Sequence, residues 1–300
     1  MNELLSMLSA WLLDLLVLGT ALLAIASLTL VFVRRPAARM AISRGTLLGL
    51  ATLFVLTALP AWPRRSLDDI FLKKVAEAEE WDDALAKMTE TEATFAAPLV
   101  LDASPARNDL PVKSLPSAEP FSTVRIFRLL PLLWLGTAGF ALAYIFLGGW
   151  RAFRILWSAA NAPDWSQQEL KSLVPPQCWM PRLKTSQRIA TAVAMIAWRP
   201  HILLATKSVN EQNKALVRAA LAHEWAHIRH GDLWLLALER LLLPIFCLHP
   251  LFWLLRRQIR MDQEILADAA AAGNAPVEYA EALLSWAKAE SQQAAPPLGI

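Results

Sequence analysis

Five consecutive residues, His223-Glu-Trp-Ala-His227, carry the clearest chemical signal in the sequence. Histidines four positions apart lie one turn apart on the same helix face, so both imidazoles can reach one metal ion. Catalytic zinc usually has three protein ligands and one position left for water. Glu224 follows the first histidine directly, where its carboxylate can activate that water as a general base. The segment predicts a zinc-dependent hydrolase with His223 and His227 as metal ligands and Glu224 as the catalytic residue.

A third ligand is expected from an acidic segment further along the chain, Arg260–Asp268. We expect this segment to be helical, so that Glu264 and Asp268, four positions apart, share one face. We predict that Glu264 completes the site of one Zn²⁺ ion per chain. Asp268 would accept a hydrogen bond from the ring N–H of a ligand histidine and fix its tautomer. Taken alone, this acidic pair is more typical of a solvated helix face.

Other polar residues near these segments are weaker candidates. Zinc peptidases usually stabilise the oxyanion of the tetrahedral intermediate with a second cation or a hydroxyl donor. Tyr279 and Arg260 could each do so, and nothing in the sequence decides between them. His230 and Asp232 are expected to be a solvated helix-end residue and a loop acid rather than ligands.

The residues around the histidine pair predict the elements that position it. The segment Ser208–Glu211 has the S-x-x-E form of a capping box, which predicts a helix from there to about His230. Gly231 follows, where a helix end favours a residue able to take positive φ. Upstream, Arg188–Leu204 mixes β-branched and apolar residues around Pro200, which predicts two short strands with a turn at the proline.

Composition indicates that much of the chain lies in a membrane. Hydrophobic residues make up 56% of the 300 residues and charged residues 18%. The mean hydropathy is +0.37, high for a soluble enzyme. Three apolar runs, Leu4–Val33, Gly45–Trp62 and Leu129–Trp150, are each near the ~20 residues that a helix needs to cross hydrocarbon. We therefore expect three transmembrane helices.

These runs divide the chain into four parts. Residues 1–62 would form two transmembrane helices with a short cytoplasmic loop, 63–128 an extracytoplasmic loop, 129–150 the third transmembrane helix and 151–300 the peptidase domain. Short cytoplasmic loops are rich in Lys and Arg, which places the loop after the first helix inside. The arginines that support this orientation are Arg34, Arg35, Arg39 and Arg44.

The 63–128 loop is acidic, and its first half has apolar residues at helical spacing between Phe71 and Met88. This spacing predicts an amphipathic helix lying on the membrane or on the other helices. The segment Ala96–Pro120 is rich in Pro, Ala and Ser and is expected to be irregular. The loop is either a sensor or a solvated connector.

The apolar stretch 233–255 resembles a fourth transmembrane helix, but a single crossing would place Glu264 on the opposite side of the membrane from the two histidines. Ligands of one ion cannot be separated by ~30 Å of hydrocarbon. Glu239-Arg240 lies in mid-run, where charges facing lipid are costly, and Pro244 and Pro250 interrupt the run. We therefore predict a membrane-associated helical hairpin at 233–255.

Nucleic-acid binding is not expected. The net charge of +3 is small, and the basic residues do not form one stripe. The two cysteines are far apart and form no CxxC pair, so they do not suggest a second metal site. The expected partners are the lipid bilayer and a protein substrate.

Several motifs together resemble the BlaR/MecR family of membrane metallopeptidases, the antirepressor proteases of antibiotic-resistance signalling. They are HEWAHIRHGD from His223, His249-Pro-Leu-Phe-Trp253 and QEILAD ending at Asp268, with Pro200–Leu204 similar to the strand before the motif. The similarity covers about 195–285. It implies a mainly α membrane protein with a small α+β, gluzincin-like zinc peptidase domain. It also implies a multi-pass protein of a bacterial-type inner membrane whose peptidase domain faces the cytoplasm and cleaves a cytosolic transcriptional repressor.

Two departures from that family keep other functions open. His249 stands where the family usually has Asn, and residues 1–300 contain no penicillin-binding sensor domain; Ser285-Trp-Ala-Lys288 has only the S-x-x-K form of one. The zinc motifs are shared with Ste/HtpX-type peptidases, so one alternative is quality control of membrane proteins. The other alternative is a non-catalytic signalling scaffold that binds no zinc. The oligomeric state is not predicted.

Overall fold

The structure is a computed structural model that describes residues 2–59, 62, 123–273 and 275–284. The amphipathic helix expected within 71–88, the irregular segment 96–120 and the Ser285–Lys288 motif lie outside the described residues.

Three helices of the described chain are long and apolar enough to cross a membrane. They are α1 (Asn2–Phe32), α2 (Pro36–Ala58) and α4 (Thr123–Trp157). Their candidate spans are Met7–Phe32, Pro36–Ala58 and Pro131–Trp157, with 26, 23 and 27 residues. The predicted class, a mainly helical protein with three membrane-length helices, is therefore confirmed.

The second of these helices begins earlier than its apolar run. Arg39 and Arg44, expected in the loop after the first helix, lie inside α2, which begins at Pro36. Proline suits the first position of a helix, because its missing N–H would have no partner there. The connection between α1 and α2 therefore consists of residues 33–35 only. Arg39 and Arg44 are helical residues and not part of this loop.

The chain forms two compact units. One consists of Met1–Val17 and Phe54–Trp134, and the other of Leu18–Leu53 and Leu135–Ile300. In the first unit, Trp11 donates a hydrogen bond from Nε1 to Oγ1 of Thr57 at 3.2 Å. Its ring meets those of Phe54 and Trp134 edge-on. The residues of the predicted metal site all belong to the second unit.

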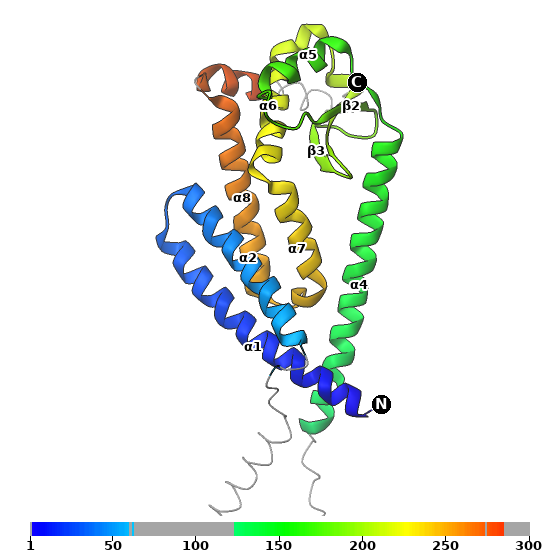
Figure 1. Ribbon diagram of the computed structural model, residues 1–300, viewed down its shortest axis with the longest axis vertical. Coiled ribbons are helices and arrows are strands. Elements are labelled where there is room, and N and C mark those ends of the chain that lie inside the picture. Colours follow the sequence, from blue (N-terminus) through cyan, green and yellow to red (C-terminus); the bar gives the residue numbers. More distant parts are fainter. Residues whose placement is uncertain (1, 60–61, 63–122, 274, 285–300) are drawn as a thin grey trace, which may run out of the picture. The chain divides into compact units, whose positions relative to one another are not determined.

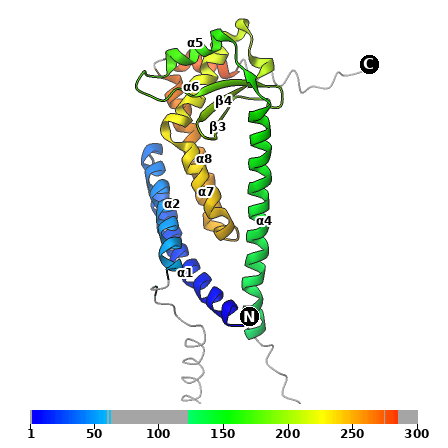
Figure 2. The same ribbon diagram turned by 45° about the vertical axis from the view of Figure 1, so that its right-hand side comes forward.

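The second unit contains a small mixed sheet. Its strands β1 (Ala160–Asn161), β2 (Arg182–Ser186), β3 (Val193–Ile196) and β4 (Pro200–Ala205) lie in the order β1-β2-β4-β3. The pair β2–β4 is parallel, whereas β1–β2 and β3–β4 are antiparallel. The two strands predicted around Pro200 are thus β3 and β4, and β3 is an edge strand beside helix α6 (Figure 2).

Helix α6 (Lys214–His230) carries the histidine pair and covers the sheet together with α5 (Asp164–Leu173). The capping box predicted at Ser208–Glu211 is wrong. Glu211–Asn213 forms a 3₁₀ turn instead, in which the Asn210 side chain accepts a hydrogen bond from the N–H of Gln212. The apolar core between these elements includes Leu170, Ile202, Leu204, Val217, Leu221 and Trp225.

The stretch after α6 consists of two helices rather than one. Gly231, with φ of 76°, ends α6 and allows α7 (Asp232–Phe246) to begin at the next residue. After a short turn, α8 (Pro250–Ala272) runs back beside α7 and reaches α6 (Figure 1). Glu264 on α8 therefore lies near the histidines of α6. A single membrane crossing by residues 233–255 would instead have placed Glu264 on the opposite side of the membrane.

Candidate metal centre

The two histidines of α6 and the carboxylate of Glu264 on α8 converge on one point. Nε2 of His223 lies 3.2 Å from Nε2 of His227 and 3.4 Å from Oε2 of Glu264. Nε2 of His227 lies 4.0 Å from Oε1 of Glu264. One ligand atom from each of the three residues lies within 4.8 Å of the others.

This spacing fits a zinc ion. Tetrahedral ligands at ~2.0–2.1 Å from zinc lie about 3.3 Å from one another, close to the distances between the two Nε2 atoms and between His223 and Glu264. The Nδ1 atoms of both histidines face carboxylates instead, Asp268 at 3.0 Å and Asp232 at 2.9 Å. A carboxylate accepts a hydrogen bond from N–H, so with zinc bound each Nδ1 would carry the proton and each Nε2 would offer its lone pair to the ion. The three residues form a metal-binding triad.

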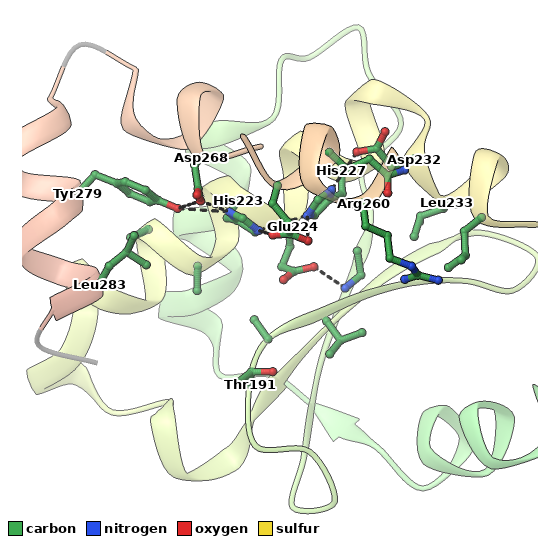
Figure 3. Close-up of a pocket in the computed structure, with 18 of the residues that line it drawn as sticks. Thr191, His223, Glu224, His227, Asp232, Leu233, Arg260, Asp268, Tyr279 and Leu283 are labelled. Carbon is green, nitrogen blue, oxygen red and sulfur yellow. Dashed lines mark hydrogen bonds and ion pairs between the residues drawn. The ribbon is translucent and has the colours of Figure 1, made fainter. Parts of the chain in front are cut away.

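Glu224 lies next to this triad on the side of the sheet. Its Oε2 accepts a hydrogen bond of 2.5 Å from the backbone N–H of Ala194 on the edge strand β3, drawn as a dashed line in Figure 3. Burial raises the pKa of Glu224, although His223, His227 and the Ala194 N–H act in the opposite direction. A carboxyl group whose pKa is raised toward neutrality is suited to accept and return a proton.

Around His223, an outer set of hydrogen bonds comes from α8 and from the segment that follows it. The hydroxyl of Tyr279 donates to Oδ1 of Asp268 at 2.8 Å and lies 3.2 Å from Nδ1 of His223. Burial lowers the pKa of His223, but the hydrogen bond with Glu264 and the charges of Glu224 and Asp268 outweigh it, so the net pKa is raised. The same hydrogen bond lowers the pKa of Glu264.

On the other side, Asp232 supports His227, a contact that the sequence analysis missed. The sequence predicts a loop acid at Asp232, but this residue is the first of α7 and is buried. The turn at Gly231 brings it back toward the last turn of α6, where Oδ2 accepts from Nδ1 of His227. An acid directly after the glycine that ends a histidine-bearing helix is the signal that could have revealed it.

The triad opens into a cavity of about 410 Å³. The cavity brings together every site residue predicted from the sequence: His223, Glu224, His227, Arg260, Glu264, Asp268 and Tyr279. Residues 191–194, which lead into β3 and form its first two positions, line the opposite wall (Figure 3). The side chain of Glu264 is 63% exposed. An extended chain could therefore enter the cavity from solvent.

The two oxyanion candidates have different surroundings. The Tyr279 hydroxyl donates a hydrogen bond to Asp268. Burial, and to a smaller extent this hydrogen bond, raise the pKa of Tyr279. The Arg260 side chain is 55% exposed and forms a long ion pair with Glu239, with NH2 at 3.9 Å from Oε2. Arg260 can thus turn toward a bound substrate at lower cost, whereas Tyr279 must release Asp268 to do so.

Comparison with known proteins agrees with the site. The family described as BlaR1 peptidase M56 matches residues 15–299, nearly the whole chain. None of the curated proteins compared with the chain matches it. The family match includes the second half of α1, all of α2 and α4 and the His-His-Glu triad, and it confirms the resemblance found in the motifs. The chain belongs to the BlaR1 peptidase M56 family and is a membrane zinc metallopeptidase.

Proposed function

We propose that the chain is an endopeptidase in which His223, His227 and Glu264 hold one zinc ion and Glu224 is the general base. The observation that carries this proposal is the convergence of the three ligand atoms beside a half-buried carboxylate in an open cavity. Zinc bound there would polarise the scissile carbonyl and lower the pKa of an attacking water. Glu224 would accept the proton of that water and return it to the leaving amine.

The edge strand β3 is the expected platform for the substrate. Ala194 directs its N–H toward Glu224, so the edge of β3 that does not pair with β4 faces the catalytic carboxylate. An extended peptide can add to such an edge through backbone hydrogen bonds, with little demand on its side chains. We propose that the substrate chain lies along residues 191–196 and crosses the cavity above Glu224.

The catalytic part of the proposal is tested with the full chain in lipid nanodiscs and an unstructured fluorogenic peptide library. Glu224→Gln should retain zinc and lose roughly 10²–10⁴-fold in cleavage rate, the usual contribution of a general base. Glu211→Gln, the same change at an exposed glutamate of the 3₁₀ turn, is the matched control and should cleave normally. Cleavage by Glu224→Gln at the wild-type rate would overturn the assignment.

We further propose that the peptidase domain faces the cytoplasm. Arg44 near the start of α2 contacts Asp232 in the site, so the site lies at the same end of α2 as the arginine-rich connection to α1. Short basic connections favour the cytoplasmic side. An impermeant thiol reagent should not label a cysteine placed at Glu211 in intact cells, but should label it after the membrane is permeabilised. Equal labelling in both would reverse the orientation.

The proposed substrate is a cytosolic transcriptional repressor, as the family resemblance implies. New N-termini would be compared in cells that express the wild type and Glu224→Gln. Cleavage confined to one DNA-binding protein supports the regulatory function. Cleavage of many misfolded membrane proteins would instead support a quality-control protease of the Ste/HtpX type.

A further inference from the structure

A chain of hydrogen bonds joins the metal site to the membrane helix α2. Nδ1 of His227 lies 2.9 Å from Oδ2 of Asp232, and the other oxygen of that carboxylate, Oδ1, lies 3.1 Å from NH2 of Arg44. The same NH2 group donates to the carbonyl oxygen of His230 at 2.6 Å. Arg44 thus contacts both the end of α6 and the beginning of α7 from within the candidate membrane span Pro36–Ala58.

The burial of Asp232 makes Arg44 more than a surface partner. The side chain of Asp232 is 6% exposed, and its two oxygens are divided between His227 and Arg44. Removing one partner of a buried charge leaves an uncompensated group, which is far costlier than losing an exposed ion pair. Without Arg44, the carboxylate would turn or take up water, and its hold on the His227 ring would weaken.

A second arginine of α2 reaches the helix that carries the third ligand. Nε of Arg39 donates to Oδ1 of Asp262 at 3.0 Å, and its NH2 group contacts the same oxygen. Asp262 is fully buried on α8, two positions before Glu264, and its other oxygen accepts from Gln258 at 3.0 Å. One membrane helix is therefore bound both to the α6–α7 junction beside His227 and to α8 beside Glu264.

From these contacts we infer that Arg44 is a positioning residue for the metal site, and that α2 sets the separation between the histidine ligands and Glu264. Arg44 acts through Asp232 on His227, and Arg39 acts through Asp262 on α8. This inference rests on the proposed function and adds that the position of α2 regulates the metal site. A shift of α2 would move His227 relative to Glu264 through these contacts, and misplacement of a reacting group by ~1 Å can cost about 10²-fold in rate. Along the chain, α2 leads directly into residues 63–122, so this helix connects that segment to the site.

Zinc affinity of the full chain in nanodiscs, measured by competition with a chromophoric chelator, tests the role of Arg44. Arg44→Ala and Asp232→Asn should each weaken zinc binding roughly 10–100-fold, as loss of an outer-shell partner usually does. Because Arg44 acts on His227 only through Asp232, the two losses should not add. The double variant should have about the same zinc affinity as whichever single variant binds zinc less tightly. Arg35→Ala removes the same charge from an exposed position of the α1–α2 connection and should bind zinc normally.

A second readout keeps the test independent of activity and of folding losses. Cobalt in place of zinc should show a changed visible absorption spectrum in Arg44→Ala but not in Arg35→Ala. If Arg44→Ala does not fold, Arg44→Lys and Arg44→Gln, which each keep a hydrogen-bond donor, should show intermediate affinities. Wild-type affinity and spectrum in every folded Arg44 variant, or losses that simply add in the double variant, would overturn the positioning role. A wild type that binds no zinc would overturn the proposed function itself.

Discussion

Nε2 of His223 lies 3.4 Å from Oε2 of Glu264, although the two residues belong to different helices, α6 and α8. This contact requires the intervening α7 to be followed by a return of the chain, since a single crossing would separate the residues by ~30 Å of hydrocarbon. The turn between α7 and α8 provides that return. The apolar stretch 233–255 thus serves to bring the third ligand back to the first two.

The support of His223 by Asp268 predicts a graded effect on metal binding. Asp268→Ala should lower zinc affinity roughly 10–100-fold, because the ring then loses the acceptor that fixes its tautomer. Tyr279→Phe should have a much smaller effect, since Asp268 still accepts from His223. Zinc competition titrations compare the two variants. Equal loss in both, or no loss in Asp268→Ala, would contradict this division of roles.

The oxyanion stabiliser is identified by its effect on kcat. Removing the group that contacts the oxyanion should lower kcat about 10²–10³-fold with zinc affinity unchanged. The exposure of Arg260 and the engagement of Tyr279 by Asp268 favour Arg260. Arg260→Ala and Tyr279→Phe are compared by steady-state kinetics on the same peptide. A loss confined to Tyr279→Phe would assign the role to the tyrosine.

Much of the fold could be predicted because its signals are local. Hydropathy reveals a membrane helix from its own ~20 residues, and β3 and β4 were predicted from the apolar segment around Pro200. The short strand β2, with the sequence RLKTS, has no apolar alternation, and it is held in the sheet by parallel pairing with β4. Pairing partners distant in sequence leave no local pattern.

Some residues of the site could likewise be predicted from local spacing, whereas others depend on tertiary contacts. His223 and His227 are four positions apart, as are Glu264 and Asp268, so spacing alone predicts one helix face for each pair. Glu224 is predicted from its place directly after the first histidine. The sequence does not reveal Asp232 and Arg44 as site residues, because their roles depend on the turn at Gly231 and on the contact of Arg44 on α2 with the first residue of α7. Arginines after an apolar run indicate membrane topology, and the sequence does not show that Arg39 and Arg44 pair with buried aspartates.

The pH dependence of zinc binding follows from the raised pKa of His223. Zinc binds the neutral imidazole, so a proton on His223 competes with the ion. Because the pKa lies above the ordinary value of 6.5, affinity should be full above the raised pKa and should fall as the pH drops through it. Asp268→Asn removes a charge that raises this pKa, so its affinity should begin to fall at a lower pH. Titrations between about pH 5 and 8 test this; an onset unchanged by Asp268→Asn would contradict it.

The turn between α6 and α7 makes a prediction about stability. Gly231 has φ of 76°, and a Cβ there would meet no atom within 4 Å, so the cost of a side chain lies in the backbone alone. Gly231→Ala should lower the free energy of unfolding by about 1–2 kcal/mol. Gly231→Asn should cost less, because Asn tolerates this conformation better. Thermal unfolding in detergent measures both, and a Gly231→Ala variant as stable as the wild type would contradict this account of the turn.

The role of Glu264 as a zinc ligand is tested by the zinc content of the purified wild type and of Glu264→Ala, determined by elemental analysis. The wild type should contain about one zinc per chain, held by three protein ligands with one position open. Glu264→Ala should contain markedly less, since α8 then no longer supplies a ligand. Equal zinc in both proteins would contradict the role of Glu264, and no zinc in the wild type would contradict the metallopeptidase itself.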